Sequence, residues 1–465
     1  MSNYIFSLEP IEVKKVKTKY RIIQTKIPCP QTKEIIGKLS KYESRSMHGQ
    51  LPIVWDTAKD FSVYDPSGNK WIDFTSTIFV ANIGHGNEHL ISKVSEILNK
   101  PLLATYAYAN YSRADYLEKL VRFAGDNFEK AFLLSAGTEA TEAASKLMKL
   151  YGRKVNKKSN LIISVNGNWH GRTMGAQLLA SNKTQREWIN VKDEETIQIP
   201  FPYPWEVSES NGAKFAQDSF NTLESKGVSI KNDICGVMLE TFQGWAAAFY
   251  PKSYVQELRL ICDDNGMLLC FDEMQSGFGR TGKNFGYEHY EVIADLICCG
   301  KGMGGGFPIS GVIGKAEIMD LPDVGNMSST HSGNPVMSEA GLAVLEEIES
   351  KNLVNESLRK GSIMHKRLNM LAQKFPNIIS SIQGKGLIAA ILFKNTVIMN
   401  IEDKVSQLAE VCMQRGLLVV HTGRESIKLG PPLTINDEAL TEGLDVLEES
   451  FYEVFRNNHF ESDSK

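Results

Sequence analysis

The chain has 465 residues, enough for two or more domains with large buried cores. Its net charge of −4 gives no sign of the basic surface that nucleic-acid-binding proteins carry. The composition, with 42% hydrophobic and 23% charged residues, is typical of a folded globular protein and argues against extensive disorder. No run of about 18 apolar residues occurs and the seven cysteines are scattered, which argues against a membrane span and a disulfide framework and favours the cytoplasm.

The first forty residues are charged and weakly patterned, which predicts an arm that wraps a neighbouring domain or subunit. From about residue 130 short apolar runs alternate with helical patterns, as is typical of an α/β domain with a mostly parallel sheet. Apolar residues recur at i, i+3 and i+4 spacing from Ala140 to Leu150, which indicates a helix with one buried face. The predicted strands are 131–134, 161–165, 236–239, 268–271 and 296–299.

The C-terminal part of the chain has a different order of elements. From Lys385 onward the run GKGLIAAILF predicts a strand. The segment VSQLAEVCMQRGLLVV predicts a helix that ends at Gly416, followed by another strand. These patterns indicate a smaller α+β domain.

Two predicted strands end in residues that can do chemistry. The run 268–271 leads directly into Asp272, and the run 296–299 leads through Gly300 into Lys301. Ligands of open parallel sheets bind beyond the carboxyl ends of the strands. A partly desolvated lysine there has a lowered pKa and forms imines with aldehydes, and an Asp there can keep a pyridine nitrogen protonated. Taken singly, Lys301 also fits a solvated turn lysine, and Asp272 a helix N-cap.

A third strand end has the composition of an anion site. The predicted strand 131–134 is followed by Ser135-Ala136-Gly137-Thr138, which opens the predicted helix. Backbone N–H groups and the helix dipole converge on an anion at such a place, and a phosphate would fit. The alternative is a tight turn with Ser135 or Thr138 as the helix N-cap.

With these features together, the chain resembles a known family, the class III aminotransferases of fold type I, which depend on pyridoxal-5′-phosphate (PLP). The resemblance runs from about Asp65 to Leu433. Seven motifs follow the family's order, namely DPSGNKWIDFTSTIFVANIGH, SAGTEATEAASKLMK, WHGRT, FDEMQSGFGRTG, ADLICCGKGMGGGFP, SSTHSGNP and GPPLTI.

The resemblance implies an α/β fold of type I, with a mostly parallel seven-stranded sheet in a large domain and a smaller α+β domain. We expect residues 1–80 to form an N-terminal arm and part of the small domain. Residues 81–335 would form the large PLP-binding domain, and residues 336–465 the C-terminal small domain.

Carried over residue by residue, the resemblance assigns the cofactor Schiff base to Lys301 and the pyridine nitrogen to Asp272. The phosphate would contact Gly137 and Thr138, and Thr330 would reach the phosphate of the partner subunit's cofactor, so a homodimer is implied. The other implied contacts are Gln275 with the phenolic oxygen of PLP, and Met274 and Trp169 with its two ring faces. His170 is expected to support these groups without carrying a proton.

The substrate pocket departs from the family pattern. Many members that use glutamate have Glu after Gln-Gly in an EPxQGE segment and Arg three residues before a Pro-Pro pair. Here the first segment runs from Glu240 to Trp245, and Lys428 replaces the Arg. Lysine lacks the planar fork that matches a carboxylate. Lys428 would therefore pair with Glu240, meet another anion, or face solvent.

The resulting prediction is an aminotransferase that moves an amino group between a primary amine or amino acid and a carbonyl acceptor. A PLP-dependent lyase or aminomutase is the alternative, because neither needs a second substrate to regenerate the cofactor. A catalytically idle PLP-fold partner is disfavoured because Lys301, Asp272 and the phosphate loop are all present. The histidines show no zinc-ligand spacing, so no metal is predicted.

Overall fold

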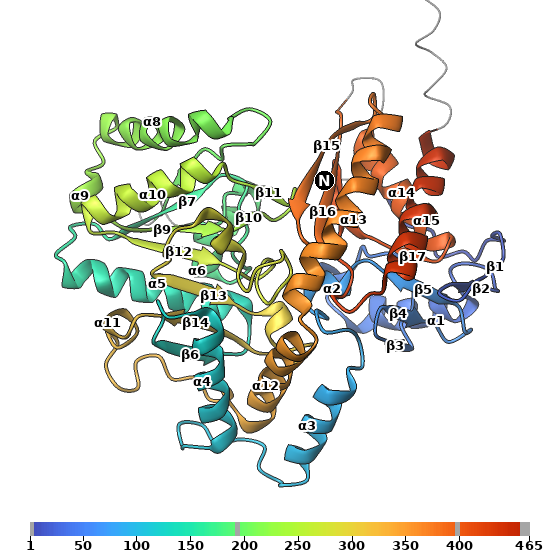
Figure 1. Ribbon diagram of the computed structural model, residues 1–465, viewed down its shortest axis with the longest axis horizontal. Helices are drawn as coiled ribbons and strands as arrows, with labels where there is room; N and C mark the ends of the chain where they lie inside the picture. Colours follow the sequence, from blue (N-terminus) through green and yellow to red (C-terminus); the bar gives the residue numbers. More distant parts are fainter. Residues whose placement is uncertain (1–3, 191–195, 396–399, 456–465) are drawn as a thin grey trace, which may run out of the picture. The chain divides into compact units, whose positions relative to one another are not determined.

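The computed structural model describes residues 4–190, 196–395 and 400–455. Its contacts divide the chain into two compact units (Figure 1). One unit is continuous and spans residues 88–355, whereas the other joins residues 1–87 to residues 356–465. None of the helices within the described ranges combines the length and hydropathy that a bilayer span requires.

The continuous unit is built on the seven-stranded sheet that was predicted. All neighbouring strands are parallel except at β14, which runs antiparallel to both of its neighbours. In spatial order the strands are β6 (Lys130–Leu134), β14 (Ser310–Gly314), β13 (Leu296–Cys299), β12 (Leu268–Asp272), β9 (Ile234–Glu240), β7 (Leu161–Val165) and β8 (Thr196–Ile199). The α/β fold with a mostly parallel sheet is confirmed.

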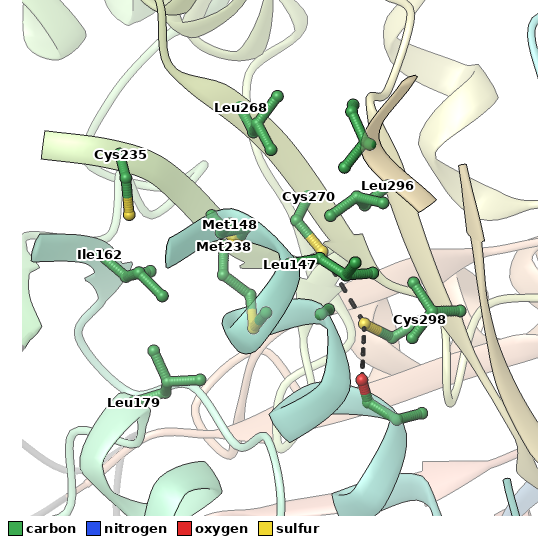
Figure 2. Close-up of a cluster of buried hydrophobic side chains, with 14 of the residues drawn as sticks. Leu147, Met148, Ile162, Leu179, Cys235, Met238, Leu268, Cys270, Leu296 and Cys298 are labelled. Carbon is green, nitrogen blue, oxygen red and sulfur yellow. Dashed lines mark hydrogen bonds between the residues drawn. The ribbon is translucent and has the colours of Figure 1, made fainter. Parts of the chain in front are cut away.

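The helix predicted after the first strand is α5 (Gly137–Lys154), and it packs on one face of this sheet. Its buried Leu147 and Met148 belong to the same apolar cluster as Cys270 and Cys298 (Figure 2). Since side chains alternate along a strand, Phe271 points to the opposite face, where it stacks on aromatic rings. Asp272 therefore shares the α5 face with Cys270.

The remaining helices of this unit pack in groups. α12 contacts both α3 and α4, and α10 contacts α8. Their bounds are α3 (Glu88–Leu98), α4 (Tyr111–Ala124), α6 (Met174–Leu179), α7 (Lys183–Arg186), α8 (Gly212–Ser225), α9 (Ile230–Asp233), α10 (Lys252–Asn265), α11 (Ala316–Met319) and α12 (Pro335–Ser350). A two-stranded ribbon joins β10 (Phe242–Gln243) to β11 (Ala248–Phe249).

The second unit holds two further sheets. One has the strand order β1 (Val16–Lys17), β2 (Ile22–Ile23), β5 (Lys70–Asp73), β4 (Ser62–Tyr64) and β3 (Thr57–Lys59), with β17 (Leu417–Leu418) parallel to β5. The other is antiparallel, in the order β15 (Ile379–Lys385), β16 (Ile388–Phe393), β19 (Ser426–Leu429) and β18 (Val420–Arg424). Its helices include α1 (Pro30–Tyr42), α2 (Ser76–Phe79), α14 (Ile401–Gln414) and α15 (Asp437–Phe455); α13 (Leu353–Lys374) starts in the continuous unit.

One local prediction for this unit needs correction. The first forty residues, predicted to form an arm, contain β1, β2 and the start of α1. The run GKGLIAAILF is not one strand: it contains the end of β15 and all of β16, separated by a turn at Gly386, whose φ is +57°. The predicted helix before Gly416 is present as α14 and ends at Gln414.

Candidate active site

Residues that follow four neighbouring strands of the large sheet meet at one cavity of about 380 Å³. These strands are β7, β9, β12 and β13, and the N-terminus of α5 after β6 also contributes. Ligands are expected at the carboxyl edge of a parallel sheet. The lining includes eight residues singled out from the sequence: Gly137, Thr138, Trp169, Glu240, Asp272, Met274, Gln275 and Lys301.

Lys301 is the second residue after β13 and has a strained backbone conformation. Gly300 separates it from the strand, and Lys301 itself has a φ of +40°, which is uncommon for a residue with a side chain. Burial lowers the pKa of the Lys301 ammonium, while the negative charges of Asp272 and Glu240 oppose that shift. The amine of Lys301 therefore loses its proton more easily than the amine of an ordinary surface lysine.

Asp272 is 5% exposed and is held by two hydrogen bonds. Oδ2 lies 2.8 Å from Nδ1 of His170, and Oδ1 accepts the N–H of Met274 at 3.0 Å. The carbonyl of His170 accepts the hydroxyl of Thr141 on α5, which anchors the histidine to that helix. The carboxylate is thereby oriented before any ligand binds, and His170 supports it as expected.

The N-terminus of α5 lines the same cavity. Its N-cap is Ala136, so the alternative in which Ser135 or Thr138 caps the helix is wrong. Oε2 of Glu139 accepts the N–H groups of Ser135 and Ala136, both at 2.9 Å. The next N–H groups, of Gly137 and Thr138, are among those that a helix cannot satisfy internally, and they are suited to an anion.

Two residues on the cavity wall are fixed by close packing. Met274 lies against two glycines, because a Cβ added at Gly137 or Gly300 would come within 2.9 or 2.7 Å of its sulfur. The guanidinium of Arg172 lies 4.3 Å from the ring centroid of Trp169, a cation–π contact. Sequence reasoning did not assign Arg172 a role, although its place in the motif WHGRT was a usable signal.

Three residues singled out from the sequence are not part of the cavity lining. Thr330 is exposed, and Trp245 is partly buried. Lys428 belongs to the other unit, on β19, where it is 5% exposed and its ammonium lies 4.9 Å from the ring centroid of Phe79. The reading in which Lys428 faces solvent is therefore wrong.

The cavity suits a phosphorylated pyridine aldehyde on chemical grounds. It offers an amine of lowered pKa, an oriented carboxylate for a ring nitrogen and a helix N-terminus for a phosphate. Nε2 of His170 is buried and has no hydrogen-bond partner among the described residues. The hydrogen bond of the ring in this part of the chain is therefore the one between Nδ1 and Asp272. This donor set fits PLP.

Comparisons with known proteins agree with this chemistry. The model of the family "Aminotransferase class-III" matches residues 43–451. A leucine/methionine racemase of Thermococcus litoralis is 32% identical to this chain, over 90% of this chain and 96% of the racemase. A probable 4-aminobutyrate aminotransferase of Bacillus subtilis is 33% identical, over 83% of this chain and 90% of that protein. The crystal structure of acetylornithine aminotransferase from Elizabethkingia anophelis is 26% identical, with a TM-score of 0.75 and coverage of 91% and 99%.

The chain belongs to the class III aminotransferase family. It is an enzyme of fold type I, its cofactor is PLP, and its reaction is the transfer of an amino group. The family, the fold, the enzyme class and the cofactor predicted from the sequence are confirmed.

Proposed function

We propose that Lys301 carries PLP covalently and is the group that moves the proton during amino transfer. The observation that carries this proposal is that Lys301 lines the same cavity as Asp272 and that burial lowers the pKa of its amine. Bound PLP supplies an electron sink that stabilises negative charge at the carbon bearing the substrate's amino group. Nζ of Lys301 would hold and move the proton of that carbon.

Other residues that line the cavity would hold the cofactor in place. Asp272, fixed by His170, would keep the pyridine nitrogen protonated, and the N-terminus of α5 at Gly137 and Thr138 would bind the phosphate. The cofactor ring would lie between Met274 and Trp169, and Gln275 would contact the phenolic oxygen. Each of these groups is positioned by protein contacts, so little reorganisation is needed on binding.

Borohydride reduction of the holoenzyme followed by peptide mapping tests this assignment. The reduced cofactor label should be found on Lys301. Lys301→Ala should abolish turnover but still bind PLP noncovalently, which is measured by retention of cofactor after gel filtration. A label on another lysine would refute the assignment.

The substrate is proposed to be a primary amine or amino acid that carries a carboxylate. Arg172 supports this class, because it is one of the residues that line the cavity and no ion pair joins it to an acidic side chain in the described part of the chain. A guanidinium can hold a carboxylate through two parallel hydrogen bonds. The carbonyl acceptor would occupy the same cavity in the second half of the reaction.

A reaction without net transfer at the same site is a second candidate beside amino transfer. It is favoured by the similarity to a racemase and by the changed residues Trp245 and Lys428, and it includes the lyase and aminomutase alternatives. A half-reaction screen against amines and amino acids distinguishes these options. Formation of the pyridoxamine form supports transfer, ammonia release supports a lyase, and a D-amino acid or an isomeric amine as sole product supports a racemase or mutase.

We also propose that the enzyme is a cytoplasmic homodimer. Thr330 is exposed on its own chain and lies outside that chain's cavity, as expected of a residue that serves a partner's phosphate. Large apolar side chains between Leu102 and Tyr111 are also exposed, including Leu103 at 56% and Tyr108 at 80%. Seven free, buried cysteines support a reducing compartment.

A further inference from the structure

Glu240 is a second carboxylate at the carboxyl edge of the large sheet. It is the last residue of β9 and is in register with Asp272 on the neighbouring strand β12. Residues in register on parallel strands point to the same face, so both carboxylates reach the cavity that Lys301 lines. Only 5% of Glu240 is exposed. A buried carboxylate in this place needs compensating contacts.

The side chain of Glu240 ties two separate segments together. Oε2 accepts the N–H of Trp169 at 3.1 Å and the N–H of Gly244 at 3.3 Å. Gly244 has no room for a side chain, because an added Cβ would lie 2.7 Å from Oε1 of Glu240 and 2.6 Å from Nε2 of Gln275. Glu240 thus contacts the backbone of one proposed ring-face residue and lies near the proposed phenolic-oxygen residue.

The charge of Glu240 acts on its neighbours from several elements. Among the described residues, the titratable groups that interact with it include Asp272 on β12, His170 after β7, Lys301 after β13 and Tyr250 after β11. Burial raises the pKa of Glu240 to about 7 and Asp272 adds to this, while His170 and the two N–H groups oppose it. In return, the negative charge of Glu240 raises the pKa of Lys301.

We propose that Glu240 is a positioning residue of the cofactor pocket: it fixes the backbone of Trp169 to the loop at Gly244 and, when ionised, adds a second negative charge to the cavity that Lys301 lines. This role rests on the proposed attachment of PLP to Lys301. Glu240 acts through Trp169 and Lys301 and exchanges no proton with the substrate.

Two variants of the holoenzyme separate the two parts of this role. Glu240→Gln removes the charge but keeps an oxygen that can accept the N–H groups. The pH midpoint of the bound cofactor's absorbance change should fall by about one unit, with visible circular dichroism unchanged. Glu240→Asp keeps the charge but is one methylene shorter, so the midpoint should stay near the wild-type value while the visible circular dichroism weakens.

Glu288→Gln is the matched control. Glu288 is also a glutamate whose burial raises its pKa, and it accepts the N–H of Phe285 outside the cavity. This variant should show the wild-type midpoint and dichroism. A wild-type midpoint in Glu240→Gln, or a shift of the same size in Glu288→Gln, overturns the electrostatic part. Wild-type dichroism in Glu240→Asp overturns the geometric part.

Borohydride labelling of the same samples separates this inference from the proposed function. Label on Lys301 together with unchanged optical properties in both Glu240 variants refutes only the role of Glu240. Wild-type enzyme without label on Lys301 refutes the proposed attachment itself.

Discussion

Nδ1 of His170 and Oδ2 of Asp272 lie 2.8 Å apart, although 102 positions separate the two residues in the chain. The contact orients the carboxylate proposed to face the pyridine nitrogen. His170→Ala should reduce turnover about 10-fold or more, because it removes a hydrogen bond to a charged group. His289→Ala, which alters a histidine that contacts Thr281 outside the cavity, is the control. Steady-state kinetics with wild-type turnover in His170→Ala would contradict the orienting role.

The amine of Lys301 should titrate below the ordinary lysine value of 10.5, because burial disfavours its charged form. Competitive acetylation of the apoenzyme over a pH series, followed by peptide mass spectrometry, measures this titration. Asp272→Asn removes a negative charge that raises the pKa of Lys301, so the midpoint should fall further. A midpoint at or above 10.5 in the wild type would show that burial does not dominate.

Glu273 should make stability depend on pH. It is fully buried, where it accepts the N–H groups of Gly286 and Tyr287 at 2.7 Å and two hydroxyls. Burial raises the pKa of Glu273 from 4.5 to about 7, so the folded chain binds its proton more tightly than the unfolded chain does. Its stabilising contribution is therefore complete below pH 4.5 and is lost as the pH rises through 7.

Glu273→Gln removes this titration. Between pH 4.5 and 7 the free energy of unfolding should change less in the variant, by about 3 kcal/mol. Urea unfolding at several pH values measures the difference. Glu240 also has a raised pKa, but its contribution to the pH dependence of stability is the same in both proteins and cancels in the comparison. The variant should also be less stable overall, since an amide leaves N–H or O–H donors without an acceptor. Parallel pH profiles for the two proteins would argue against the raised pKa of Glu273.

Glutamate should be a weak amine donor for this enzyme. Where many glutamate-using relatives have Arg, this chain has Lys428, which lacks the planar fork that matches a carboxylate, and where they have Glu it has Trp245, which brings no negative charge. Lys428→Arg combined with Trp245→Glu restores the family's pair of residues and should improve the glutamate half-reaction. Stopped-flow absorbance measures the rates. Glutamate as the best donor of the wild type, or unchanged preference in both single variants, would refute the hypothesis.

If the exposed apolar side chains between Leu102 and Tyr111 form the proposed dimer contact, charged substitutions there should weaken the dimer. Leu103→Asp with Tyr108→Asp should lower the mass in light scattering toward that of one chain, because charges would be buried in the contact. The variant should also lose PLP more readily, since Thr330 could no longer reach a partner's phosphate. Leu260→Asp alters an equally exposed side chain on α10 and should leave the mass unchanged. A dimer that survives the first change would exclude this surface.

Sequence patterns predicted the strand ends well and the contacts between them poorly. The ends of β12 and β13 were found because buried parallel strands are continuous apolar runs, and Asp272 and Lys301 interrupt them. The strands β1 and β2 have two residues each, too few to show a period.

Contacts between distant segments leave no local pattern in one sequence. The bond of Oε2 of Glu240 to the N–H of Trp169 joins residues 71 positions apart, and the cation–π contact of Arg172 depends on which rotamer the packing selects. The N-cap at Ala136 was missed for another reason, because an alanine side chain cannot accept a hydrogen bond. The N–H groups of Ser135 and Ala136 are instead satisfied by the carboxylate of Glu139, in the first turn of the helix.

The packing of Met274 between Gly137 and Gly300 bears on how this pocket can vary among relatives. A methionine sulfur within 2.9 Å of both hypothetical Cβ positions leaves no space for a side chain at either glycine. In a relative with alanine or serine at one of these positions, the residue equivalent to Met274 must be smaller or must turn away. The residues at these three positions should therefore change together among homologues. In an alignment, such correlated substitutions would show how much space each relative leaves for the cofactor ring.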